Sequence, residues 1–222
     1  MIKWGVPQEE GLEALAILQE AAEQEGRQLR ILDVGGGMKP MVFATHIIDY
    51  LPFYNRAWYG RIPDEAGAGA ERFTEETWLE WDICQMPWPY RDHEFDMVWC
   101  TQTVEDVRDP VGVIREIERV GKCGYLNTID RNFESQPGVS DANFVGYVHH
   151  RWLISPDGDK LRFVFKSPLL HAYPELRPRP SGEWILGLWW TGECPVYEYL
   201  PMNEQAIKDE LLGYAEQFIS PE

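Results

Sequence analysis

The chain has 222 residues, of which 44% are hydrophobic, so it is long enough and apolar enough to bury a core. Its 37 acidic and 20 basic residues give a formal net charge of −17 at pH 7, which disfavours nucleic acid as a partner because a phosphate backbone would be repelled. No window approaches the about 18 apolar residues of a membrane span, and the N-terminus lacks the apolar stretch of a secretory signal. We therefore expect a soluble, cytoplasmic protein with neither nucleic acid nor a membrane as its partner.

Short apolar runs alternate with helical patterns up to about residue 130. In chain order we expect a helix over 8–25, strands over 29–34 and 45–49, a loop rich in glycine and alanine over 60–72, a short helix or extended piece over 74–80, strands over 78–82 and 95–100, a helix over 111–120 and a strand over 124–128. This alternation predicts an α/β fold with a doubly wound, mostly parallel sheet.

The pattern changes after residue 145. Apolar runs over 151–154 and 161–165 flank the turn residues 156–159, and two further runs, 184–190 and 195–200, flank 191–193. Each pair predicts a hairpin, and we expect these strands to extend the sheet antiparallel at its edge. A helix is predicted over 203–218, and with no clear linker the chain is expected to form a single domain over 1–222.

The most informative stretch is the run 30–37, in which an apolar strand ends in Asp33 and three glycines follow, Gly35, Gly36 and Gly37. Glycine permits a tight turn and lets the backbone approach a ligand closely. The free N–H groups of such a loop face a negative or polar ligand. The stretch therefore predicts a nucleotide-binding loop after a parallel strand.

Three acidic residues, Asp33, Asp49 and Asp82, fall at the ends of successive predicted strands. Singly, each is more simply a helix cap or a turn former. In an open α/β sheet, however, the ligand lies beyond the carboxyl ends of the strands. An acid after the second strand suits ribose hydroxyls, and Asp82 followed by the apolar Ile83 suits adenine. Three such acids behind a glycine loop favour a binding site.

Several segments in this order resemble class I S-adenosylmethionine-dependent methyltransferases, of the methyltransferase type 11 kind. They are 32–37, 82–90, 92–98, 103–110 and 120–125. His150-Arg151-Trp152 and the predicted hairpin after it are similar to one subset in which the first helix is very short. Only residues 41–44 remain for that helix, and Lys39-Pro40 departs from the family's glycine pattern.

The resemblance implies an enzyme that transfers a methyl group from S-adenosyl-L-methionine to a small-molecule acceptor. It implies that the glycines admit the methionine part, with Asp33 near its amino group, Asp49 on the ribose and Asp82 with Ile83 on the adenine. The residues it assigns to the cofactor are Asp33, Gly35, Gly36, Gly37, Asp49, Asp82, Ile83 and Thr101.

The catalytic assignment is different, because Gln102 and Asp106 stand where the family has two histidines. The sulfonium is already activated, so alignment supplies most of the acceleration and a base helps only some acceptors. The candidate catalytic residues are Gln102, Glu105, His149 and His150. No metal site is expected from His149 and His150, because adjacent residues of a strand face opposite sides. A structural role in packing the C-terminal strands is an equal alternative for 150–152.

Two other functions fit the same residues less well. The missing histidines and Lys39 leave open a regulatory or assembly subunit that binds the adenosyl cofactor without catalysis, with a partner surface near Trp189-Trp190. A homodimer is compatible with that tryptophan pair. A nicotinamide-dependent oxidoreductase ranks below both, since the loop lacks the later glycine of that fingerprint.

Overall fold

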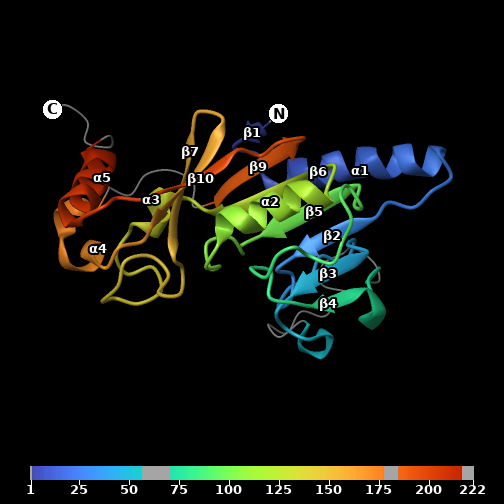
Figure 1. Cartoon of the computed structure of the whole chain (residues 1–222), viewed down its shortest axis with the longest axis horizontal. Coiled ribbons are helices and arrows are strands. Elements are labelled where there is room, and N and C mark those ends of the chain that lie inside the picture. The colour runs from blue at the N-terminus through green and yellow to red at the C-terminus, as the bar shows by residue number, and fades with distance from the viewer. Residues whose placement is uncertain (1, 57–70, 178–184, 217–222) are drawn as a thin grey trace. The chain divides into compact units, whose positions relative to one another are not determined.

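A computed structural model describes residues 2–56, 71–177 and 185–216. The chain divides into two compact units (Figure 1). The first contains residues 1–104, 109–127 and 187–194, and the second contains 105–108, 128–186 and 195–222. The expectation of a single domain over 1–222 stays a prediction. Most of the predicted loop over 60–72 lies outside the described residues.

The first unit is built on a large sheet. Among the described residues its strand order is β1-β9-β6-β5-β2-β3-β4. The strands are β1 (Ile2–Trp4), β2 (Ile31–Val34), β3 (His46–Asp49), β4 (Trp78–Glu80), β5 (Met97–Thr101), β6 (Cys123–Ile129) and β9 (Ile185–Thr191). The pairs β2–β3, β3–β4, β2–β5 and β5–β6 are parallel. The α/β fold class with a mostly parallel sheet is thereby confirmed.

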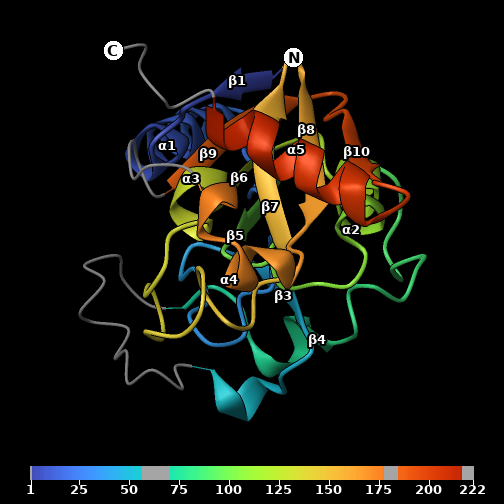
Figure 2. The same ribbon diagram turned by 90° about the vertical axis from the view of Figure 1, so that its left-hand side faces the viewer.

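Helices α1 (Gln8–Gln24) and α2 (Pro110–Val120) lie on opposite faces of this sheet (Figure 2). All residues of β2 and β6 are buried, as is typical of parallel strands covered on both faces. The close packing of α1 depends on Gly11, where an added Cβ would lie 2.8 Å from the Tyr125 ring and 3.2 Å from that of Trp99. The segment 74–80, expected to be a short helix or an extended piece, contains both: the short helical piece η3 (Glu75–Thr77) comes first and the strand β4 follows. Another short helical turn, η1, spans Phe53–Asn55.

The connection from β2 to β3, residues 35–45, contains turns but no helix. The short helix expected over 41–44 is a single turn closed by a hydrogen bond from the Ala44 N–H to the Met41 carbonyl (2.9 Å). Phe43 from this turn packs edge-on against Trp99 of β5, with ring centroids 5.1 Å apart. A turn that contributes two apolar side chains, Met41 and Phe43, to the core replaces the usual crossover helix.

The second unit holds a three-stranded sheet in the order β10-β8-β7. Its elements are β7 (Trp152–Asp157), β8 (Lys160–Phe165), β10 (Val196–Tyr199), α3 (Arg131–Glu134), α4 (Leu169–Ala172), η4 (Pro174–Leu176) and α5 (Glu204–Glu216). The predicted hairpin over 151–165 is confirmed as the antiparallel pair β7–β8. The expectation that it extends the large sheet is wrong, because these strands bury their apolar face on a core of their own that includes Leu153, Val164 and Leu211.

The second predicted hairpin, over 184–200, does not form. Strand β9 joins the large sheet and pairs antiparallel with β1, whereas β10 pairs parallel with β8. Trp190 of β9 is 1% exposed, and Trp189 packs partly against the core of the first unit. Apolar character alone could not show which sheet each strand would join. None of the described helices is long and apolar enough to span a membrane.

Candidate functional site

The large sheet reverses its winding direction between β2 and β5. The chain runs from β2 through β3 to β4, and then returns to β5 on the other side of β2, followed by β6. Ligands of open α/β sheets bind beyond the carboxyl ends of the strands at such a switch point. The residues that follow β2 and β5 here are the glycine loop, 35–37, and the segment 102–104.

These two segments are in contact. Gly35 has a φ of +78°, and a Cβ added to it would lie 2.3 Å from Oγ1 of Thr103. The Thr103 hydroxyl donates to the carbonyl of Thr101 (3.0 Å), and the Gly35 N–H donates to the carbonyl of Ile48 (3.0 Å). Glycine is therefore required at position 35 both by its backbone conformation and by the nearby Thr103 side chain.

The substitution Gly35→Ala is expected to destabilise the protein by about 2 kcal/mol or more, through the left-handed backbone and the clash with Thr103. Chemical denaturation measures this free energy of unfolding. Gly158→Ala is the matched control, because Gly158 also has a positive φ (+61°) but has no atom within 4 Å of an added Cβ. Equal losses in the two variants would contradict the packing argument.

Two carboxylates accept hydrogen bonds from backbone N–H groups in and around the glycine loop. Asp33 Oδ2 accepts the Met41 N–H (2.9 Å), Asp49 Oδ2 accepts the Gly37 N–H (2.9 Å), and Asp49 Oδ1 accepts the Leu51 N–H (2.6 Å). An added Cβ at Gly37 would lie 2.2 Å from Asp49 Oδ1, and one at the preceding glycine 2.3 Å from Asp33 Oδ2. The structure thus brings Asp33, Asp49 and the loop together as the sequence predicts.

Burial makes this carboxylate pair unusual. Asp33 is 1% exposed, and burial together with the nearby charge of Asp49 raises its pKa to about 7, against the opposing Met41 N–H. Burial also raises the pKa of Asp49, while the N–H groups of Leu51 and Gly37 lower it. Two carboxyl groups of raised pKa in one place favour a ligand that donates hydrogen bonds or carries positive charge.

The third acid lies in a turn beside the end of β3. Asp82 Oδ1 accepts the Cys84 N–H (3.0 Å), and the preceding Trp81 donates its N–H to the carbonyl of Asp49 (2.7 Å). Ile83 is 8% exposed, and its carbonyl accepts the indole N–H of Trp88 (2.8 Å). Asp82 therefore forms the turn that the simpler interpretation predicts, two residues after the end of β4, the strand that pairs with β3.

Gln102 has a left-handed backbone, with a φ of +51°. Its N–H donates to the carbonyl of Asn127 (3.0 Å), and its side-chain amide donates to Asn127 Oδ1 (3.1 Å). A non-glycine residue held in this conformation costs about 1–3 kcal/mol and is characteristic of ligand-binding sites. Thr101 precedes it as the last residue of β5 and is partly buried. The strain supports Gln102 as a site residue.

The other catalytic candidates belong to the second unit. Glu105 is 1% exposed, and its Oε2 accepts the Thr128 hydroxyl (3.0 Å). Its buried Oε1 has no hydrogen-bond partner in the described part of the chain. Burial raises the pKa of Glu105 to about 7, so much of this group is protonated near neutrality. A buried carboxyl of this kind can hold or release a proton near pH 7.

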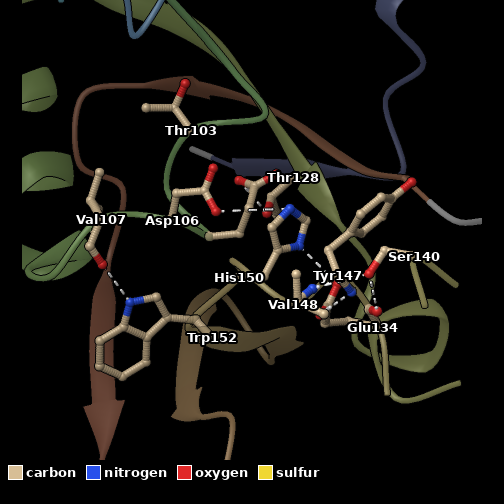
Figure 3. Close-up of polar contacts among 12 residues, drawn as sticks. Thr103, Asp106, Val107, Thr128, Glu134, Ser140, Tyr147, Val148, His150 and Trp152 are labelled. Atoms are coloured by element: carbon tan, nitrogen blue, oxygen red, sulfur yellow. Dashed lines mark hydrogen bonds and ion pairs between the residues drawn. The ribbon is translucent and has the colours of Figure 1, made fainter. Parts of the chain in front are cut away.

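His150 lies between two carboxylates (Figure 3). Its Nδ1 is 2.8 Å from Glu134 Oε2, and its Nε2 is 3.9 Å from Asp106 Oδ1. Because a carboxylate only accepts hydrogen bonds, Nδ1 carries the proton toward Glu134. The His149 ring lies 4.6 Å from that of His150, between centroids. The expectation that the two rings face opposite sides is wrong, because both residues precede β7 and His149 lies in a turn.

Comparison with known proteins gives one family match. A family model described as "Methyltransferase domain" matches residues 63–126, less than a third of the chain. Over this stretch the chain is similar to a methyltransferase domain. The match includes Asp82, Ile83, Thr101, Gln102 and Glu105, and the resemblance inferred from the sequence is confirmed there. The subset with the 150–152 segment stays a prediction. No curated protein matches the chain.

Three solved structures resemble the chain weakly. A protein from Pyrococcus horikoshii is 14% identical, with 83% of this chain and 89% of that chain covered and a TM-score of 0.45. S-adenosylmethionine-dependent methyltransferases from Aquifex aeolicus (15% identity, 72% and 80% covered, TM-score 0.36) and Mesorhizobium loti (13%, 62% and 57%, 0.35) are similar too. The chain covers only 40%, 63% and 51% of three further matched structures. We draw no functional conclusion from likenesses this weak.

Sequence reasoning missed three side chains. In the sequence, Thr103 is only one residue of a motif, and the structure shows that its side chain packs on Gly35. Glu134 and Lys166 carry no motif, and only the structure shows that they form an ion pair next to His150 (2.5 Å between Lys166 Nζ and Glu134 Oε1). Nothing in their sequence spacing could have revealed that pair, because it depends on how α3 and β8 pack.

Proposed function

We propose that the chain binds S-adenosyl-L-methionine at the switch point of its large sheet and transfers the methyl group to a small-molecule acceptor. The observation that carries this proposal is the contact of Gly35 with Thr103, flanked by Asp33 and Asp49, at the carboxyl ends of β2, β5 and β3. The methyltransferase match over 63–126 supplies the reaction class.

The residues suit the parts of such a cofactor. The amino group and the sulfonium are cationic, which matches the buried pair Asp33 and Asp49. Each Asp49 oxygen accepts one N–H within the chain and keeps a lone pair for a ribose hydroxyl. In the proposal, Asp82 and Ile83 receive the adenine, and Thr101 and the glycines line the methionine part.

Catalysis in this proposal rests mainly on alignment of the acceptor with the methyl group, because the sulfonium is already activated. The strained Gln102 is the positioning residue that the structure supports best in the first unit. Glu105, His149 and His150 stay candidates for proton transfer, and substitution of each tests that role. A cofactor-binding subunit without catalysis would bind the cofactor equally well and transfer no methyl group.

Thermal unfolding with different ligands tests the cofactor. S-adenosylmethionine and S-adenosylhomocysteine are expected to raise the melting temperature, since a ligand at about 100 times its Kd adds about 2.7 kcal/mol of stability. NAD at the same concentration is expected to leave it unchanged. In calorimetry, Asp49→Ala should weaken cofactor binding at least about tenfold, whereas Asp92→Ala, at a side chain that is 74% exposed, should not. A shift with NAD alone overturns the proposal.

A further inference from the structure

We propose that Asp106, His149 and His150 form a binding site for one divalent first-row transition-metal ion such as zinc. Each side chain offers one ligand atom, and these atoms all lie within 4.8 Å of one another. All three residues belong to the second unit. The inference does not depend on cofactor binding, because none of these three residues is assigned to the cofactor.

The donor set suits such an ion. Two imidazoles and one carboxylate are ligands that zinc and related ions take in proteins, with bonds of about 2.0–2.2 Å and open positions left for water or substrate. Ligand atoms around an ion of this kind lie about 3–4 Å apart, and His150 Nε2 is 3.9 Å from Asp106 Oδ1. The Asp106 side chain is 42% exposed and His149 is exposed, so small rotations close the remaining distance.

The orientation of His150 supports a metal ligand. Its Nδ1 donates to Glu134 Oε2 at 2.8 Å, and its side chain is 7% exposed. Histidine ligands of metals usually give their other ring N–H to a carboxylate, which fixes the tautomer and directs the second nitrogen at the ion. Glu134 is itself held by the Tyr147 N–H (3.0 Å) and by Lys166. The Nε2 atom is thereby fixed on the side of Asp106, as Figure 3 shows.

Asp106 provides a second, independent observation. Its Oδ1 atom is buried and has no hydrogen-bond partner among the residues that the structure describes. The contact with His150 Nε2, at 3.9 Å, is too long to be a hydrogen bond. A buried carboxylate oxygen without a donor is costly unless a cation or a water meets it.

The cluster has more groups than a general base requires. A histidine that acts as a general base needs only one carboxylate to orient its ring, and Glu134 does this for His150. The cluster has in addition a second ring, His149, with centroids 4.6 Å apart, and a second carboxylate, Asp106, on the far side of His150. A metal ion requires these two additional ligands, whereas a general base does not.

Metal binding by the tag-free, full-length protein tests the proposal. After removal of metals with a chelator, titration with Zn²⁺ in calorimetry should give one equivalent bound, and Co²⁺ should give the visible absorption of a low-symmetry complex. Loss of one ligand in His149→Asn or Asp106→Asn should weaken binding by about 100-fold or more, beyond the 10–100-fold effect of outer residues. Both side chains are exposed, so neither variant should unfold.

His93→Asn is the matched control, because it removes an imidazole elsewhere and asparagine tolerates the left-handed backbone at this position (φ +53°). It should bind Zn²⁺ as the unaltered protein does. The proposal is overturned if no equivalent binds, or if His149→Asn and Asp106→Asn bind as tightly as the control. Melting temperatures of all variants without metal show that the fold is intact, and calorimetry with S-adenosylhomocysteine reports separately on the other site.

Discussion

Asp33→Asn is expected to make the free protein more stable at about pH 8 and, under the proposed function, to weaken its binding of S-adenosylmethionine. Asp33 is 1% exposed, and its pKa rises from 3.8 to about 7 on folding because burial disfavours the charged carboxylate. Above about pH 7 the folded protein must hold that charge in its core. Asparagine keeps an acceptor for the Met41 N–H and removes the charge.

The sign of the pH dependence follows from the raised pKa. Between about pH 4 and pH 7 the folded state keeps a proton on Asp33 that the unfolded state has lost, so stability falls as the pH rises. A pKa shift of this size lowers the free energy of unfolding by at most about 4 kcal/mol. Asp33→Asn should lack this part of the loss when chemical denaturation is compared at about pH 5 and about pH 8.

Asp92→Asn serves as the control, since that carboxylate is 74% exposed and should leave the pH dependence unchanged. If Asp33→Asn loses stability at about pH 8 and keeps the slope of the unaltered protein, the charged carboxylate is stabilising and our account of the loop is incorrect. Calorimetry with the cofactor then tells whether stability and binding oppose each other at this residue.

Glu134→Ala is expected to be the most destabilising single change in the second unit, by about 3–5 kcal/mol. Lys166 is 4% exposed, and its Nζ lies 2.5 Å from Glu134 Oε1. Removing Glu134, which is 1% exposed, leaves a buried ammonium whose remaining hydrogen bond, within the part of the chain that the structure describes, is to the Tyr147 carbonyl (2.6 Å). The free energy of unfolding from denaturant titration measures the loss.

Replacing both partners at once tests the cause. In Glu134→Leu with Lys166→Met no buried charge is left unpaired, so much of the stability should return. The exposed pair of Lys208 and Glu204 on α5 provides the comparison, and Glu204→Ala should change stability little. A double variant as unstable as Glu134→Ala would mean that the contacts of Glu134 with His150 and Tyr147, rather than its charge, stabilise this region.

Most of the parallel strands and the place of the glycine loop could be predicted from the sequence. Period and composition mark β2, β3, β5 and α2 to within about two residues. The carboxyl ends of parallel strands lie at one edge of the sheet. Because Asp33 and the glycines stand at the end of a predicted strand, the sequence alone places them at that edge. Asp49 was found by the same argument, and its contact with the Gly37 N–H agrees with it.

Features that depend on packing between distant segments could not be predicted. Whether β10 pairs with β8 or with β9 depends on which core its side chains complete, and each alternative has the same pattern of apolar residues. The expectation that the rings of His149 and His150 face opposite sides treats both as strand residues, whereas they lie before β7. The two carboxylates beside His150 come from α3 and from the segment after β5, which no local pattern connects.

The helix-free connection between β2 and β3 also bears on the order in which the protein folds. Pairing these two strands closes only the loop 35–45, whereas pairing β2 with β5 closes the loop 35–96. Since the entropy of loop closure grows with the logarithm of loop length, the first pairing is cheaper by on the order of 1–2 kcal/mol. Local contacts also form faster than distant ones. We therefore expect the β2–β3 pair, with Met41 and Phe43 packed on it, to form before β2 pairs with β5.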